Sequence, residues 1–318
     1  MAIAGDQKIR WGIIGTGGIA STFAGDVALL TDAQVVAVGS RSQGSADEFA
    51  DRFGIERRHP SYQALVDDPD VDAVYVSTPH PMHHDAALLA IRAGKAVLVE
   101  KPFTINAGEA RELVAEARAG GTFLMEAMWT RFLPHIVRVR ELLASGRLGD
   151  VRSLVADHGQ WFPHDPKHRL FAPELGGGAL LDLGIYPVSF ASMIFGRPAK
   201  ITATSDPAFT GVDAQTGMLF QYSAGQRAIL FTTLETRTAN QAVINGTEAR
   251  LEIDGVFYAP SNFRVIDRDG AIERFDVPHE GQGLRHQAAE VGRCLRAGRT
   301  ESEIMPLDET IAIMETLD

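Results

Sequence analysis

The chain has 318 residues, of which 45% are hydrophobic and 22% are charged, and its formal net charge at pH 7 is −11. This length suits two domains of ordinary size, and the composition is that of a soluble globular protein. The negative charge argues against a nucleic-acid binder, because phosphate contacts need clustered lysine and arginine.

Strand and helix patterns alternate through the first 128 residues. Strands that alternate with helices are typical of a parallel sheet with both faces covered. The predicted strands are 9–14, 34–39, 73–76, 96–99 and 122–126, and the predicted helices are 19–30, 45–53, 86–93 and 107–119. We therefore predict an α/β domain over residues 1–128.

The pattern changes after Trp129. A helix is predicted at 136–144 and an extended segment at 151–161, and the turn Gly176-Gly177-Gly178 opens a helix that runs to Ile194. The later strand-like runs are 218–222, 228–234, 241–245, 249–253 and 263–266, and helices at 282–296 and 307–317 close the chain. This pattern predicts an α+β domain over residues 129–318, with a mostly antiparallel sheet whose uncovered face could form a dimer.

A glycine-rich turn directly follows the first predicted strand and opens a helix. In Gly15-x-Gly17-x-x-Ala20, the first glycine permits a tight turn, the second lets a pyrophosphate approach the backbone, and the alanine permits close packing. The free N–H groups of the helix would then face the phosphates. A tight turn without a ligand is the alternative interpretation.

The end of the second strand selects the dinucleotide. An NAD enzyme usually carries a carboxylate here to bind the ribose hydroxyls, whereas this chain has Ser40-Arg41-Ser42. Arginine and two hydroxyl groups suit a 2′-phosphate, so NADP is favoured and NAD remains possible. In the alternative, Arg41 is a solvated loop residue and both cofactors work.

Two further motifs indicate chemistry. Lys101, in Glu100-Lys101-Pro102, stands at the carboxyl end of a strand, where ligands bind in open parallel sheets, although it could be a surface lysine. Asp182 and Tyr186 are four residues apart and share one face of an otherwise apolar helix. Burying them without partners would be costly, so they need either ligands or structural partners.

In this order and separation, the glycine turn, Glu100-Lys101-Pro102 and Gly177-Gly178…Asp182…Tyr186 resemble the glucose–fructose oxidoreductase/inositol dehydrogenase (Gfo/Idh/MocA) family. The segments 125–132 and 181–186 look most like its branch of dimeric dihydrodiol dehydrogenases and NADP-dependent D-xylose dehydrogenases. The resemblance covers essentially the whole chain. It implies a Rossmann domain, a second domain with a large open sheet that often forms a dimer, and NAD(P)-linked oxidation of a secondary alcohol or an anomeric carbon.

The resemblance also implies residue roles. Lys101 matches the catalytic lysine, Tyr186 the acid/base tyrosine, and Asp182 the aspartate that orients the substrate. In the expected reaction, Tyr186 takes the hydroxyl proton while Lys101 favours its phenolate form. The expected cofactor-binding residues are Gly15, Gly17, Gly18, Ile19, Ser40, Arg41, Ser42, Thr78, Pro79, His83, Glu100 and Lys101. Two residues depart from the family pattern, His80 in place of asparagine and Gln287 in place of glutamate.

Other functions stay open at this point. A family member could hold its cofactor tightly and recycle it, in sugar–sugar oxidoreduction or glycoside cleavage, and a third possibility is a non-catalytic NADP-binding sensor. We expect no metal site. In the loop after residue 161, His164, His168 and Arg169 could contact sugar hydroxyls.

Cys294, the single cysteine, is expected to pack rather than react. Residues 1–10 hold no apolar stretch, so no signal peptide is expected, and no uninterrupted apolar run approaches the ~20 residues of a membrane helix. We therefore expect a cytoplasmic homodimer or higher homo-oligomer that acts on a small molecule, with no nucleic-acid or membrane partner.

Overall fold

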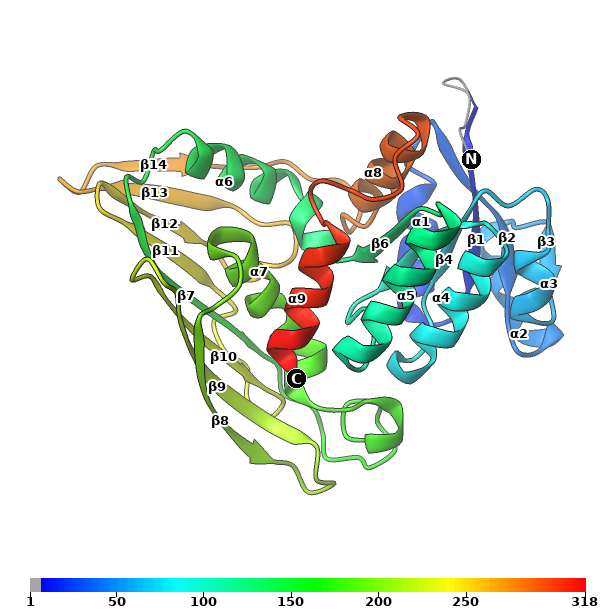
Figure 1. The fold of residues 1–318 in the computed structure, drawn as a ribbon, viewed down its shortest axis with the longest axis horizontal. Helices are drawn as coiled ribbons and strands as arrows, with labels where there is room; N and C mark the ends of the chain where they lie inside the picture. Colours follow the sequence, from blue (N-terminus) through cyan, green and yellow to red (C-terminus); the bar gives the residue numbers. More distant parts are fainter. Residues whose placement is uncertain (1–6) are drawn as a thin grey trace. The chain divides into compact units, whose positions relative to one another are not determined.

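The computed structural model describes residues 7–318, which divide into two units (Figure 1). The first unit holds the described residues up to Trp129 together with Glu280–Met314, and the second holds Thr130–His279 with Glu315–Asp318. The expectation that no signal peptide is present falls largely on residues 1–6, outside the described residues.

The last part of the chain differs from the predicted division at residue 128. Helix α8 (Arg285–Arg296) packs against α1 (Gly18–Val27) of the first unit, although we had placed it in the second domain. The Asp26 carboxylate of α1 accepts the backbone N–H of Gln282 at 2.8 Å and that of Arg285 at 3.3 Å. Nothing in the local sequence pattern of α8 encodes this partner.

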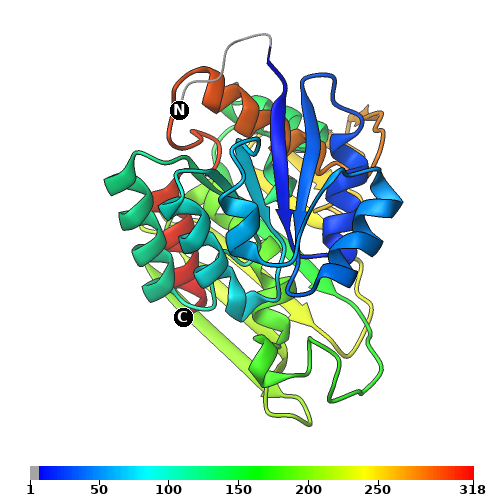
Figure 2. The ribbon, with the colours of Figure 1, turned by 90° about the vertical axis from the view of Figure 1, so that its right-hand side faces the viewer.

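The first unit contains a sheet of six parallel strands in the order β3-β2-β1-β4-β5-β6. The strands are β1 (Ile9–Ile14), β2 (Ala33–Gly39), β3 (Arg57–His59), β4 (Ala73–Val76), β5 (Ala96–Glu100) and β6 (Leu124–Ala127). Its other helices are α2 (Gln43–Phe53), α3 (Tyr62–Val66), α4 (His83–Arg92), α5 (Ala107–Gly120) and α9 (Leu307–Leu317), which continues into the second unit. Figure 2 shows the strands with helices on both faces.

This strand order is that of a Rossmann fold, and it decides where a ligand can bind. The chain runs outward from β1 to β3 and then returns to β4 on the other side of β1, so the order reverses between β1 and β4. Connecting segments diverge at such a switch point and leave a crevice beyond the carboxyl ends of the strands. At this switch point Gly15 follows β1 and Ser77 follows β4, so a ligand is expected to bind beyond these two strand ends.

The second unit contains a sheet of eight strands in the order β14-β13-β12-β11-β7-β10-β9-β8. They are β7 (Val151–Gly159), β8 (Lys200–Pro207), β9 (Asp213–Gln221), β10 (Arg227–Thr233), β11 (Ala242–Gly246), β12 (Ala249–Ile253), β13 (Phe263–Asp267) and β14 (Ile272–Phe275). Only the β7–β10 pair is parallel, so the predicted mostly antiparallel sheet is confirmed.

Helices α6 (Pro134–Ala144) and α7 (Ile185–Phe195) lie on one face of this sheet (Figure 1). Strand β9 alternates buried and half-buried residues along its whole length, because one of its faces meets the core. Strand β8 is exposed throughout, and most of β14 is exposed. The predicted strands do not include β8 and β14, which lack the alternation of buried and half-buried residues. They also do not include β3, which has only three residues.

One helical stretch, Pro173–Phe195, is apolar and long enough to cross a bilayer by length and composition. Of the 18 consecutive residues in it that are most apolar, 67% are buried inside the protein, as in a core helix. It includes the three-glycine turn and α7, so it supports Asp182 and Tyr186.

A buried histidine makes the stability of the second unit dependent on pH. His135 lies 3.1 Å from the Phe257 carbonyl oxygen through Nε2, and burial lowers its pKa to about 4. Between pH 6.5 and 4 the unfolded chain binds a proton here that the folded chain does not, so stability falls as the pH falls. We expect His135→Gln to reduce this acid loss by up to about 3 kcal/mol. Melting temperatures of both proteins at pH 7 and pH 4.5 test this, and equal losses would contradict it.

Candidate active site

The turn after β1 requires glycine at Gly15. Its φ is +106°, and a Cβ there would lie 2.9 Å from the Ser77 carbonyl oxygen at the end of β4. Its N–H donates to the Gly39 carbonyl at the end of β2, at 3.0 Å. Gly15 therefore lets three strand ends meet at the switch point.

The residues around this turn fit a dinucleotide. A Cβ on Gly17 or Gly18 would meet nothing within 4 Å, so the space beside the start of α1 is open. Helix α1 begins without a capping side chain or an acidic residue, which leaves its first N–H groups available to an anion. Ile19 is 40% exposed on the same turn. The Thr78 hydroxyl, beyond the end of β4 and just before Pro79, is buried without a hydrogen-bond partner among the described residues.

The Ser40-Arg41-Ser42 segment follows β2. Ser40 is buried and its N–H donates to the His59 carbonyl, whereas Arg41 and Ser42 are exposed. The Ser42 hydroxyl accepts the Ser45 N–H at 3.3 Å and so caps α2. Burial raises the pKa of Tyr62, and the charge of Arg41 works against that rise, so the guanidinium lies near this ring.

Lys101 follows β5 at the carboxyl edge of the sheet and is half-buried. Its backbone N–H donates to Glu100 Oε2 at 3.1 Å, and the Tyr75 hydroxyl donates to Glu100 Oε1. Glu100 is only 5% exposed. This carboxylate therefore fixes the backbone that carries Lys101, and a contact between Glu100 and a cofactor stays a prediction.

His83 has a similar supporting position. The ring is completely buried, with Nδ1 2.8 Å from the Pro102 carbonyl oxygen and Nε2 2.8 Å from that of Thr78. Burial, together with the charges of His80 and Lys101, lowers its pKa to about 4. The neutral ring carries one N–H and donates to one carbonyl at a time. His83 thus joins the Thr78 segment to the Lys101-Pro102 turn, and its contact with a cofactor stays a prediction.

The sequence analysis singled out three other residues of the first unit: His80, Gln287 and Cys294. His80 is buried, with its ring 5.6 Å from that of His83, and Gln287 is buried with no hydrogen-bond partner for its amide among the described residues. Burial raises the pKa of Cys294 to about 12, as expected of a packing residue. No group of three or more metal-ligand side chains occurs within residues 7–318.

In the second unit, the glycine turn brings two segments into contact. A Cβ on Gly177 would lie 2.7 Å from the Leu170 carbonyl oxygen, and one on Gly178 would collide with the Asp213 carboxylate. Asp213 accepts the Leu180 N–H at 2.6 Å, at the start of a π-helical turn, Leu180–Gly184, that leads into α7. Asp213 thus caps the helix that carries the two predicted site residues, and burial raises its pKa.

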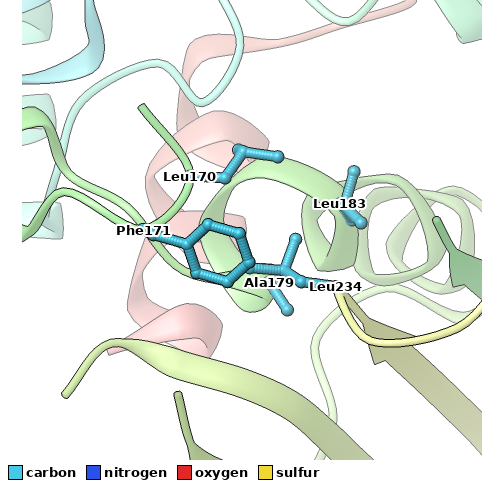
Figure 3. Packing of buried hydrophobic residues seen from close by; sticks show 5 residues of the cluster. All are labelled: Leu170, Phe171, Ala179, Leu183 and Leu234. Carbon is cyan, nitrogen blue, oxygen red and sulfur yellow. The ribbon is translucent and has the colours of Figure 1, made fainter. Parts of the chain in front are cut away.

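Asp182 is 3% exposed and forms a bidentate ion pair with Arg169, at 2.9 Å and 3.1 Å. A small apolar cluster holds the two segments together, since Leu170 and Phe171 follow Arg169 and Leu183 follows Asp182 (Figure 3). The cluster consists of Leu170, Phe171, Ala179, Leu183 and Leu234. The planar guanidinium matches the geometry of a carboxylate, so both Asp182 oxygens are hydrogen-bonded.

Tyr186 is 7% exposed and lies in an aromatic cluster with His158 and Tyr258. The Tyr186 and Tyr258 rings are 4.5 Å apart and 30° from parallel. His168 and His164, in contrast, pack against Phe162 and Phe209, and His164 pairs with Glu235. Of His164, His168 and Arg169, the loop residues considered as sugar contacts, Arg169 is the one that contacts Asp182.

In the second unit, Arg169 pairs with Asp182, and Tyr186 lies four residues further along the same helical segment. In the first unit, Lys101 lies at the carboxyl edge of the parallel sheet. Comparison with known proteins then gives the family. Residues 9–128 match the oxidoreductase family with an NAD-binding Rossmann fold, and residues 136–252 match its GFO/IDH/MocA C-terminal domain.

The chain belongs to the Gfo/Idh/MocA oxidoreductase family. Trans-1,2-dihydrobenzene-1,2-diol dehydrogenase from Mus musculus is 39% identical over 98% of this chain and 96% of its own, and the Homo sapiens enzyme is 38% identical with the same coverage. Aldose-aldose oxidoreductase from Caulobacter crescentus, solved with glycerol, is 26% identical with a TM-score of 0.89, over 98% of this chain and 95% of its own.

A third similar structure is a 3-ketoreductase from Actinomadura kijaniata, solved with NADP and TDP-benzene. It is 29% identical, with a TM-score of 0.85 over 98% of this chain and 96% of its own. The predicted family and its two-domain fold are confirmed. The dihydrodiol dehydrogenases that the segments 125–132 and 181–186 pointed to are among the similar relatives.

Four residues packed around the helix of Asp182 and Tyr186 were missed by sequence reasoning: Asp213, His158, Gln160 and Tyr258. Asp213 begins β9, His158 and Gln160 lie at the end of β7, and Tyr258 lies in the loop between β12 and β13. They come from three segments far apart in the chain, and no local motif marks any of them. A polar His158 within an otherwise strand-like run was the one available signal.

Proposed function

We propose that the chain is an NADP-dependent oxidoreductase that transfers hydride between a nicotinamide and a secondary alcohol or the anomeric carbon of a sugar or cyclic diol. The observation that carries the proposal is Tyr186, buried on the same helix as the Arg169-paired Asp182. A lysine at the carboxyl edge of the Rossmann sheet and 39% identity to diol dehydrogenases support it.

Each residue has a separate task in this proposal. Tyr186 takes the proton of the reacting hydroxyl, and Lys101 favours the phenolate form of that tyrosine. Asp182, held in position by Arg169, orients the substrate through a hydrogen bond. Glu100 and His83 hold the Lys101-Pro102 turn in place. The bound cofactor supplies the hydride acceptor, while the protein supplies orientation and electrostatics.

The test is a set of initial rates with NADP⁺ and NAD⁺ on a trans-dihydrodiol, D-xylose and D-glucose. Turnover with NADP⁺ on a diol or sugar is the expected result. A protein that binds NADP but oxidises none of a broad panel of alcohols and aldoses would contradict the proposal.

We propose that the exposed guanidinium of Arg41, in the Ser40-Arg41-Ser42 segment, binds the 2′-phosphate of NADP. We expect Arg41→Ala to raise the KM for NADP⁺ about tenfold, because a charge-assisted hydrogen bond is lost, and to leave the KM for NAD⁺ within about twofold. Steady-state kinetics with both cofactors measure this. Arg52→Ala, an exposed change on α2 beside Phe49, is the control, and equal effects of Arg41→Ala on both cofactors would exclude a phosphate contact.

A second candidate function is sugar–sugar oxidoreduction with a retained cofactor. The similarity to an aldose-aldose oxidoreductase favours it. Protein purified without added nucleotide would then contain about one cofactor per chain, detectable by absorbance after denaturation. Absence of bound nucleotide would remove this candidate.

The outward face of the eight-stranded sheet supports a proposed homodimer. Val155, Ile229 and Leu219 are in register across β7, β10 and β9, with Val155 43% and Ile229 53% exposed. Such a row of apolar side chains on an open sheet favours burial against a second copy.

We expect Ile229→Glu to convert a dimer into a monomer in analytical ultracentrifugation. Ile272→Glu changes an equally exposed residue on the edge strand β14, four strands away from β7, and should leave the dimer intact. A monomeric wild-type protein would contradict the proposal.

We further propose a cytoplasmic location and a small-molecule partner, supported by the single cysteine and the net charge of −11.

A further inference from the structure

The helical segment that carries Asp182 and Tyr186 contains a proline directly after the tyrosine. Pro187 has no backbone N–H, so the α-helical hydrogen bond from residue 187 to the Leu183 carbonyl cannot form. A proline ring inside an α-helix also collides with the carbonyl four residues earlier. The helix widens just before this point, in the π-helical turn Leu180–Gly184, so the local sequence and the local conformation agree.

Two neighbouring strands of the sheet donate to carbonyls of this turn. Because a carbonyl only accepts, His158 Nδ1, which lies 3.1 Å from the Leu183 carbonyl oxygen, carries a proton. The Thr232 hydroxyl donates to the Ala179 carbonyl at 3.3 Å. His158 and Thr232 are buried and paired directly across β7 and β10. Strands about 4.8 Å apart match helical turns about 5.4 Å apart, so two paired residues can hold carbonyls one turn apart.

The winding of this turn sets the angle between Asp182 and Tyr186. A π-turn holds about one residue more than an α-turn, so rewinding it would rotate Asp182 about the helix axis relative to Tyr186. Asp182 meets Arg169 at 2.9 Å. The Tyr186 ring lies 5.3 Å from that of His158. Rewinding the turn as an α-helix would therefore break one of these two contacts.

We propose that His158 is a positioning residue of the reaction. By donating to the carbonyl that Pro187 leaves without its helical donor, it maintains the π-helical turn, and this turn holds Asp182 and Tyr186 in their working arrangement. His158 acts through the backbone of Leu183 and does not need to touch the substrate. The inference rests on the proposed function only in giving Asp182 and Tyr186 their roles.

Two substitutions separate the hydrogen bond of His158 from its ring. His158→Phe keeps an aromatic ring and removes the donor, and we expect kcat to fall about 10²-fold, as for a small displacement of reacting groups. In His158→Asn, the side-chain amide places an N–H near the position of Nδ1, so this variant should retain most of the wild-type kcat. Initial rates at saturating NADP⁺ and alcohol measure both.

Adding Pro187→Ala to His158→Phe distinguishes positioning from stability. The alanine carries the N–H that proline lacks, so the Leu183 carbonyl regains a donor within the helix. The melting temperature, lowered in His158→Phe, should then recover. The value of kcat should stay low, because the turn rewinds as an α-helix. A residue with only a structural role would regain kcat together with stability.

Two measurements test the hydrogen bond and the turn without turnover. In protein labelled with ¹⁵N-histidine, the His158 signal, assigned by its loss in His158→Phe, should show a proton on Nδ1. A crystal structure of the double variant should show an α-helical turn in which the Asp182–Arg169 ion pair is broken or the Tyr186 ring has moved.

The inference is overturned by full kcat in His158→Phe, by His158→Asn as slow as His158→Phe, or by recovery of kcat together with melting temperature in the double variant. It is also overturned by a His158 without a proton on Nδ1, or by a π-helical turn that persists in the double variant. A protein that oxidises no alcohol, but whose turn rewinds in the double variant, would overturn the proposed function and leave the role of His158 in this turn in place.

Discussion

Replacing Lys101 by alanine is expected to lower kcat/KM for the alcohol by about 10²–10⁴-fold, the usual contribution of a positioned acid–base group and its partner. Lys101 follows β5 at the carboxyl edge of the sheet, on a backbone fixed by Glu100 and His83. The loss should appear mainly in kcat, since the ammonium group acts on the proton transfer. Initial rates with saturating NADP⁺ measure it.

Lys95→Ala is the matched control for a loss of folding. Lys95 immediately precedes the same strand, and its Nζ donates to the carbonyls of Asp68 at 2.7 Å and Val71 at 2.8 Å. We expect Lys95→Ala to lower the melting temperature and leave kcat nearly unchanged. Lys101→Ala should lower kcat and leave the melting temperature nearly unchanged. If Lys101→Ala retained full kcat, Lys101 would have no catalytic role.

Replacing Tyr186 by phenylalanine is the second large expected effect. The change removes the phenol oxygen and keeps the ring that packs beside His158 and Tyr258, so stability should change little. We expect kcat to fall by about 10²–10⁴-fold with a small change in KM. Rate measurements on the best substrate, together with melting temperatures, separate these contributions.

Two comparisons sharpen this result. Tyr222→Phe removes a hydroxyl from the same unit and should keep wild-type kcat. The double variant Lys101→Ala/Tyr186→Phe should be little slower than either single variant, because residues that act together in one step are not additive. Additive losses would show that Lys101 and Tyr186 act in separate steps.

The sequence by itself determined the architecture and the main candidate residues. Buried parallel strands appear as short apolar runs, so β1, β4 and β5 were predicted with bounds correct to within one residue. The glycine turn and the Gly177-Gly178…Asp182…Tyr186 spacing are local patterns, and the family they indicated is the one that the chain belongs to.

Only the tertiary structure decided which partners surround those residues. Arg169 on Asp182, Asp213 at the start of the helix, and the series His158, Gln160 and Tyr258 all join segments that are distant in sequence. The same holds for the packing of α8 on the first unit and for the burial of His83 and Glu100. Periodicity and spacing encode the local conformation of the backbone, whereas hydrogen-bond partners depend on which segments the fold brings together.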